Sequence, residues 1–253
     1  MKQVLVGLQP QNLEDVIALI SLYRPGPMDS IPTYLRNRHE PDKISYKTPQ
    51  LAHILDVTNG CIVYQEQVMQ IFRELAGFSF GQADNVRRAM SKKKHAVMEA
   101  EREHFVHGCT EPGHECPGCV ANGISEKVAN EIYDEMSSFA SYAFNKSHAA
   151  CYAYVAFQTA YLKCHYPSEF MAALLTSVLD NTDKVIEYSG ECARLGIKVL
   201  PPDVNVSGGG FTADENGQIR FGLNAVKNVG RNLIENVVRE RRNKPYTRDR
   251  KSV

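Results

Sequence analysis

Helical periodicity, interrupted by caps and breakers, dominates residues 10–195 of this sequence. Asn12 is a suitable N-cap for a first helix, which Pro25 and Gly26 would end. Apolar residues then recur every three or four positions within 65–80, and a basic helix is expected from about 82. The stripe of 65–80 consists of Val68, Ile71, Phe72, Leu75 and Phe78. These patterns predict a mainly α fold.

The most apolar stretch is AACYAYVAFQTAYL, residues 149–162. It is too short to span a bilayer, so we predict a buried core helix and no membrane partner. The first eleven residues lack the apolar core and cleavage site of a secretion signal. The seven cysteines are an odd number, typical of reduced thiols in a cytoplasmic protein.

The sequence changes character after residue 196. KVLPPDVN suggests a short strand entering a loop, SGGG suggests a flexible loop, and Asn216-Gly217 suggests the turn of a β-hairpin before a last helix. The predicted fold class is therefore mainly α, with a helical domain at 1–195 and a small α/β appendage at 196–245. Residues 246–253 are interpreted as a vector-derived or disordered tail.

A basic run, NVRRAMSKKKH, concentrates positive charge in a chain that has 29 basic and 29 acidic residues. Its cations are Arg87, Arg88, Lys92, Lys93 and Lys94. Arg88 and Lys92 share a helical face, where like charges repel unless an anion lies between them. A solvated helix end is the alternative, and charge counting alone favours it.

A second cluster, Asn145, Lys146, Ser147 and His148, lies where the apolar helix begins. A helix N-terminus beside cations and aromatic rings suits phosphate binding with base stacking. An ordinary capped helix with a satisfied histidine explains the same residues equally well. The stiff loop YRPGP presents Arg24 close to its prolines.

The loop 107–119 supplies candidate zinc ligands at Cys109, His114, Cys116 and Cys119. The second ligand pair of a usual structural zinc site is missing, so a surface loop with incidental thiols is the favoured interpretation. The sequence also lacks phosphate-binding glycine loops and a nucleophile elbow, and we find no convergent carboxylates for two-metal chemistry.

Several long motifs closely resemble the α subunit of bacterial DNA polymerase III, DnaE type. They are ISLYRPGPMDSIPTY, GCIVYQEQVMQI, ADNVRRAMSKKK, FNKSHAACYAYVAFQTAYLKCHYPSEFMAALL and KVLPPDVN. The resemblance runs in order from about 5 to 245 and corresponds to the fingers region. The palm with its catalytic aspartates would precede it, so Met1 is expected to mark a cloning boundary.

The resemblance implies a role for each cluster. Arg87 and Arg88 match paired arginines that contact the triphosphate, and Lys92–Lys94 match the basic tail of that motif. The second cluster, residues 145–148, matches a motif lining the nucleotide pocket. Arg24, Tyr64, Gln65 and Glu66 match positions near the same cleft. VKNVG, at 226–230, resembles the entry to a helix-hairpin-helix DNA-binding module.

The resemblance also implies a function, namely binding of incoming dNTP and primer–template DNA during DNA synthesis. Mg²⁺ would accompany the dNTP, held mainly by the palm, so this chain alone is expected to be inactive. The implied partners are the rest of the α subunit and, through it, the sliding clamp and other replisome subunits. The alternative is a free-standing helical module for nucleic acid or protein, stabilised by Zn²⁺ if the cysteine loop binds metal.

Overall fold

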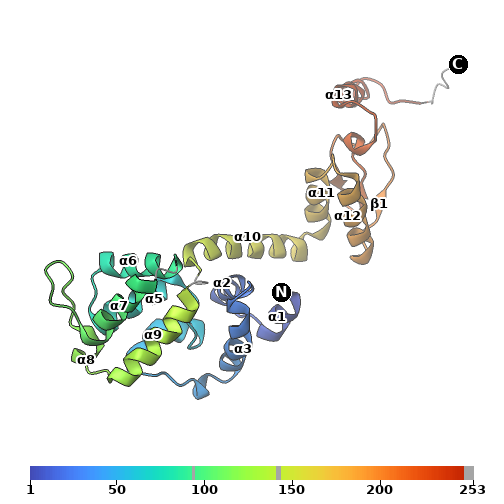
Figure 1. The fold of residues 1–253 in the computed structure, drawn as a ribbon. Coiled ribbons are helices and arrows are strands. Elements are labelled where there is room, and N and C mark those ends of the chain that lie inside the picture. Colours follow the sequence, from blue (N-terminus) through green and yellow to red (C-terminus); the bar gives the residue numbers. More distant parts are fainter. Residues whose placement is uncertain (93–94, 141–143, 248–253) are drawn as a thin grey trace. The chain divides into compact units, whose positions relative to one another are not determined.

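The computed structural model describes residues 1–92, 95–140 and 144–247, and its contacts divide the chain into two compact units (Figure 1). They are Met1–Val155 and Ala156–Val253. The predicted domain boundary at 195/196 stays a prediction, because contact density within one chain does not show where a piece folds on its own.

Helices make up most of the regular secondary structure described in the first unit. Its α-helices are α1 (Lys2–Leu8), α2 (Leu13–Leu22), α3 (Ile31–His39), α4 (Ala52–Leu55), α5 (Gln65–Ala76), α6 (Phe80–Ser91), α7 (His95–His107), α8 (Gly118–Ala121), α9 (Glu126–Ala140) and the first half of α10 (Lys146–His165). Short 3₁₀ turns connect some of them: η1 (Pro27–Ser30), η2 (Pro41–Lys43), η3 (Pro49–Leu51) and η4 (Asp56–Thr58).

The core of the first unit forms around α5. The apolar stripe predicted within 65–80 is fully buried, together with apolar faces of α6, α7 and α9. The Phe72 ring packs against Phe78, Phe105 and Tyr133, with ring centroids 4.9–6.0 Å apart. The predicted helix is too long by four residues, because Gly77 adopts a left-handed conformation (φ 75°) that ends α5 and lets α6 begin at Phe80.

Gln67 fixes the start of α5 from inside the protein. Its side-chain oxygen accepts hydrogen bonds from the backbone N–H groups of Val63 and Tyr64, both at 2.9 Å. Its amide nitrogen donates to the carbonyl of Ile54 (3.1 Å) and the hydroxyl of Thr58 (2.7 Å). Four partners satisfy this buried amide, so the first turn of α5 is held rigidly.

A second cluster joins α2 and α3 to the beginning of α10. The predicted N-cap of α2 is confirmed, because the Asn12 side chain accepts from the backbone N–H of Asp15 at 3.0 Å. Asp15 in turn accepts from Arg38 of α3 at 3.1 Å, which ties the two helices together.

The prediction of a buried core helix at 149–162 is wrong. Within α10 the described buried residues are Ala149 and Ala153, four positions apart on one face. The apolar side chains that are 46–61% exposed are Tyr152, Tyr154, Val155, Phe157, Tyr161 and Leu162. Hydrophobicity on all sides of a helix suggests burial, but it does not tell whether neighbouring elements cover each side. No described helix is long and apolar enough to cross a membrane.

The second unit contains the rest of α10, two further helices, a small sheet and a last helix. Its elements are α11 (Pro167–Ser177), α12 (Thr182–Arg194), β1 (Val199–Leu200), β2 (Thr212–Ala213), β3 (Ile219–Arg220), the 3₁₀ turn η5 (Leu223–Ala225) and α13 (Arg231–Glu240). The strand order is β1-β3-β2, with β1 parallel and β2 antiparallel to β3. The mainly α fold with a small α/β segment is thereby confirmed.

Two predicted loops lie in the second unit. The hairpin between β2 and β3 turns where predicted, with Gly217 at φ 70°. The SGGG segment is a loop, and it packs closely against neighbouring groups. A Cβ on Gly209 would lie 2.7 Å from the Asn224 amide, and one on Gly222 would lie 2.5 Å from the Gly210 backbone. Glycine is needed there because two backbone segments approach closely.

Candidate functional site

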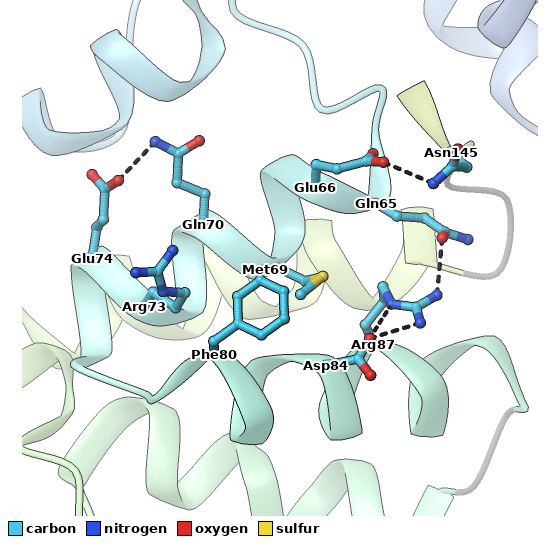
Figure 2. Close-up of a pocket in the computed structure, with 10 residues that line it drawn as sticks. All are labelled: Gln65, Glu66, Met69, Gln70, Arg73, Glu74, Phe80, Asp84, Arg87 and Asn145. Carbon is cyan, nitrogen blue, oxygen red and sulfur yellow. Dashed lines mark hydrogen bonds and ion pairs between the residues drawn. The ribbon is translucent and has the colours of Figure 1, made fainter. Parts of the chain in front are cut away.

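A hollow of about 460 Å³ lies in the first unit, between α5 and α6 and beside the residue that precedes α10 (Figure 2). It is lined by Gln65, Glu66, Met69, Gln70, Arg73, Glu74, Phe80, Asp84, Arg87 and Asn145. The predicted residues Gln65, Glu66, Arg87 and Asn145 are therefore brought together from three separate segments of the sequence.

Arg87 is held on both sides of its guanidinium. Its Nε and Nη2 donate to Asp84 Oδ1 at 2.9 and 2.7 Å, and its Nη1 donates to Gln65 Oε1 at 2.9 Å. The two bonds to Asp84 stay within α6, and the bond to Gln65 crosses from α6 to α5, as Figure 2 shows. The hydrogen bond from Arg87 is the main cause that lowers the pKa of Asp84, with the charges of Arg87 and Arg88 adding to it. The hollow therefore presents an oriented cation.

Arg88 faces a different hollow from Arg87. Its Nε donates to the other carboxylate oxygen, Asp84 Oδ2, at 2.7 Å, and its side chain is 65% exposed against 24% for Arg87. With Lys92 it lines a smaller hollow of about 260 Å³. Lys93 and Lys94 lie outside the described residues. The adjacent arginines are thus separated in space.

The N-terminus of α10 already holds a carboxylate of the protein. Glu66 accepts hydrogen bonds from Asn145 Nδ2 at 2.9 Å and from the backbone N–H of Lys146 at 3.1 Å. The Asn145 oxygen accepts from the backbone N–H of His148 at 2.9 Å, as an N-cap does. An anion expected at this helix end from the sequence would have to compete with Glu66.

The remaining residues of the predicted cleft lie beside the hollow. Lys146 Nζ pairs with Glu14 at 2.9 Å and lies 5.3 Å from the centre of the buried Tyr64 ring. Burial raises the pKa of Tyr64, so its hydroxyl stays protonated. Arg24 lies over the Phe144 ring at 4.6 Å, and His148 contacts that ring at 5.5 Å between centroids. Ser147 is exposed.

Sequence reasoning missed six residues of the hollow: Met69, Gln70, Arg73, Glu74, Phe80 and Asp84. Helical spacing could have indicated the four that belong to α5, because they follow Gln65 and Glu66 on one face of that helix. These four are Met69, Gln70, Arg73 and Glu74. No comparable signal marks Phe80, which is 65% exposed and lies 5.9 Å from the Arg73 guanidinium. It reaches the hollow only because Gly77 turns the chain there.

The predicted zinc ligands do not converge. Cys109 and Cys116 form an isolated antiparallel bridge through two backbone hydrogen bonds of 2.9 Å, while His114 is exposed. Cys119 is fully buried in the core, where burial raises its pKa to about 12. The described residues contain no group of three His, Cys, Asp or Glu side chains that could hold a metal ion. The cysteine loop therefore does not fit a zinc site.

Thiol alkylation tests this conclusion. We expect iodoacetamide at neutral pH to modify the exposed Cys151 and Cys164 first, and Cys61 and Cys119 last, as followed by peptide mass spectrometry. Thiolate is the reacting species, and burial raises the pKa of Cys61 to about 11 and that of Cys119 further. If added Zn²⁺ protected Cys109, Cys116 and Cys119 together from alkylation, the conclusion that the cysteine loop does not fit a zinc site would be contradicted.

Fold and site together define a mainly helical protein. Its first unit holds the Arg87 guanidinium in the α5–α6 hollow, and its second unit contains a small sheet, with the β2–β3 hairpin, before α13. Residues 1–113 match the family described as bacterial DNA polymerase III alpha subunit finger domain, and residues 196–250 match the helix-hairpin-helix motif. Residues 1–113 thus correspond to the finger domain of bacterial DNA polymerase III α subunits, and nearly the whole chain is similar to those subunits.

Relatives match over nearly the whole chain. The DNA polymerase III subunit alpha of Thermus aquaticus is 50% identical over 240 residues, which are 93% of this chain and 19% of that protein. The corresponding subunit of Bacillus subtilis is 45% identical over 97% of this chain and 21% of its own length. That of Chlamydia trachomatis is 47% identical over 97% and 19%. The chain thus spans about a fifth of the length of these relatives.

Proposed function

We propose that this chain is the fingers region of a replicative DNA-directed DNA polymerase, which binds the triphosphate of the incoming dNTP and contacts primer–template DNA during 5′–3′ synthesis. The observation that carries the proposal is the Arg87 guanidinium, oriented by Asp84 and Gln65 in the α5–α6 hollow. The similarity to these relatives supports it, because the named relatives are DNA polymerase subunits.

In this proposal Arg87 stabilises charge on the phosphate oxygens. Phosphoryl transfer develops negative charge that a prepositioned cation stabilises without further reorganisation. Arg87 presents a planar fork that matches phosphate geometry, and Asn145 adds an amide on the neighbouring wall of the hollow. Arg88, Lys92 and Lys146 lie outside this hollow, so we assign them supporting positive charge rather than direct contact.

The carboxylates of the hollow do not fit a Mg²⁺ site. Asp84 accepts hydrogen bonds from two arginines, Glu66 accepts them from the start of α10, and Glu74 accepts one from Gln70. A divalent cation would need oxygen ligands that these partners already occupy. The Mg²⁺ that accompanies a dNTP would therefore be held by polymerase residues outside this chain.

The second unit is proposed to contact DNA. Residues 226–230 form a turn in which Asn228 has φ 63°, and α13 begins directly after Gly230. Lys227 is exposed in this turn, and the match to the helix-hairpin-helix motif covers the segment. Backbone N–H groups at a helix start and a nearby lysine suit a DNA phosphate.

A thermal-shift measurement on the 253-residue chain tests nucleotide binding. We expect a dNTP to raise the melting temperature by several degrees, because a ligand that binds only the folded state stabilises it. Arg87→Ala should abolish the shift, whereas Arg194→Ala, at a residue of the second unit that is 73% exposed, should keep it. A module that docks an acidic protein would show no nucleotide effect, and that result would contradict the proposal.

A further inference from the structure

Asp84 divides its carboxylate between two adjacent arginines. It lies about one helical turn before them in α6, with Oδ1 accepting from Arg87 and Oδ2 accepting from Arg88. Both Asp84 oxygens thus have guanidinium partners at 2.7 Å. Neighbouring like charges would otherwise repel, and a carboxylate between them offsets that repulsion.

The two arginines consequently point to different places. Arg87 lines the α5–α6 hollow and is only 24% exposed, while Arg88 lines the second hollow and is 65% exposed. An arginine side chain is long and flexible, so a fixed direction requires contacts at its charged end. Asp84 supplies such a contact to Arg87 from α6, and Gln65 supplies the opposite one from α5.

We propose that Asp84 is a positioning residue of this site, which holds the Arg87 guanidinium in the α5–α6 hollow and keeps Arg88 out of it. The inference rests on the proposed function, since it assigns to Asp84 the alignment of Arg87 at a site that binds a nucleoside triphosphate. Asp84 touches neither nucleotide nor metal in this role and acts through Arg87.

The charge of Asp84 predicts a distinctive kinetic signature. A carboxylate beside an anion site repels the bound triphosphate, so its presence weakens ground-state binding while it improves the alignment of Arg87. Removing the charge should therefore lower the maximal rate without weakening nucleotide binding. If Asp84 served only folding, its substitution would lower the amount of active enzyme. The maximal rate and the apparent dNTP Kd of the remaining folded enzyme would be unchanged.

The experiment uses the intact DNA polymerase III α subunit that carries this region, with primer–template DNA and single-turnover incorporation of one dNTP. Asp84→Asn keeps the shape, but its amide has one accepting oxygen in place of two. We expect the maximal rate to fall about 10-fold to 100-fold, with an apparent dNTP Kd that is unchanged or lower. Asp84→Glu keeps the charge and should recover part of the rate.

The matched control is Asp134→Asn, which removes a carboxylate paired with Arg102 at 2.6 Å and away from both hollows. It should leave the rate and the apparent Kd unchanged. A wild-type rate in Asp84→Asn, a raised dNTP Kd with normal rate, or an Asp84→Glu variant no better than Asp84→Asn would overturn the inference.

Arg87→Ala, measured in parallel, separates the two proposals. If Arg87→Ala incorporates dNTP like the wild type, the proposed function itself fails. If Arg87→Ala is impaired while Asp84→Asn is not, only the role of Asp84 fails.

Discussion

Replacing Arg87 and Arg88 together by alanine is expected to lower kcat/KM for nucleotide incorporation by the intact α subunit about 100-fold to 1000-fold. Losses of this size are typical when a prepositioned hydrogen-bond donor is removed from a site where negative charge develops in the transition state. Most of the loss should arise from Arg87→Ala alone, because Arg87 lies in the α5–α6 hollow and Arg88 is 65% exposed outside it. Steady-state incorporation of single nucleotides on a primer–template measures the effect.

DNA binding provides the contrast. The double variant should change the Kd for primer–template DNA far less than it changes incorporation, as measured by fluorescence anisotropy. The matched control is Lys227→Ala in the turn before α13, which should weaken DNA binding and reduce its salt dependence by about one phosphate contact. Equal losses of DNA binding and incorporation in the double variant would contradict a nucleotide-specific role for the arginines.

Phe72→Ala is expected to lower the free energy of unfolding of the first unit by about 3–5 kcal/mol. Phe72 is fully buried, and its ring contacts three other aromatic rings at the centre of the core formed by α5, α6, α7 and α9. The substitution removes apolar burial and leaves a cavity that the surrounding helices fill incompletely. Urea denaturation followed by circular dichroism reports the loss.

Phe80→Ala is the control for that measurement. It removes the same side chain from a position that is 65% exposed, so the free energy of unfolding should change by no more than about 0.5 kcal/mol. Because two units can unfold in separate steps, the comparison is made on the transition that Phe72→Ala shifts. Similar losses in the two variants would show that the core is not organised around Phe72.

The helical periodicity of the first unit could be predicted because local physics determines it. The stripe along α5, the Asn12 cap and the turn at Asn216-Gly217 depend on residues a few positions apart. The exposed face of α10 and the packed SGGG segment could not be predicted in the same way. Both depend on which distant elements cover a side chain or approach a backbone.

The candidate site shows the same division. The sequence by itself determined the cations and the amides, the family they resemble and the anionic ligand class they suit. Only the tertiary structure decided that Arg87 and Arg88 separate, that Glu66 occupies the start of α10, and that Cys119 lies in the core. The physical reason is that charge and hydrophobicity belong to single residues, whereas direction and burial depend on neighbours contributed by other helices.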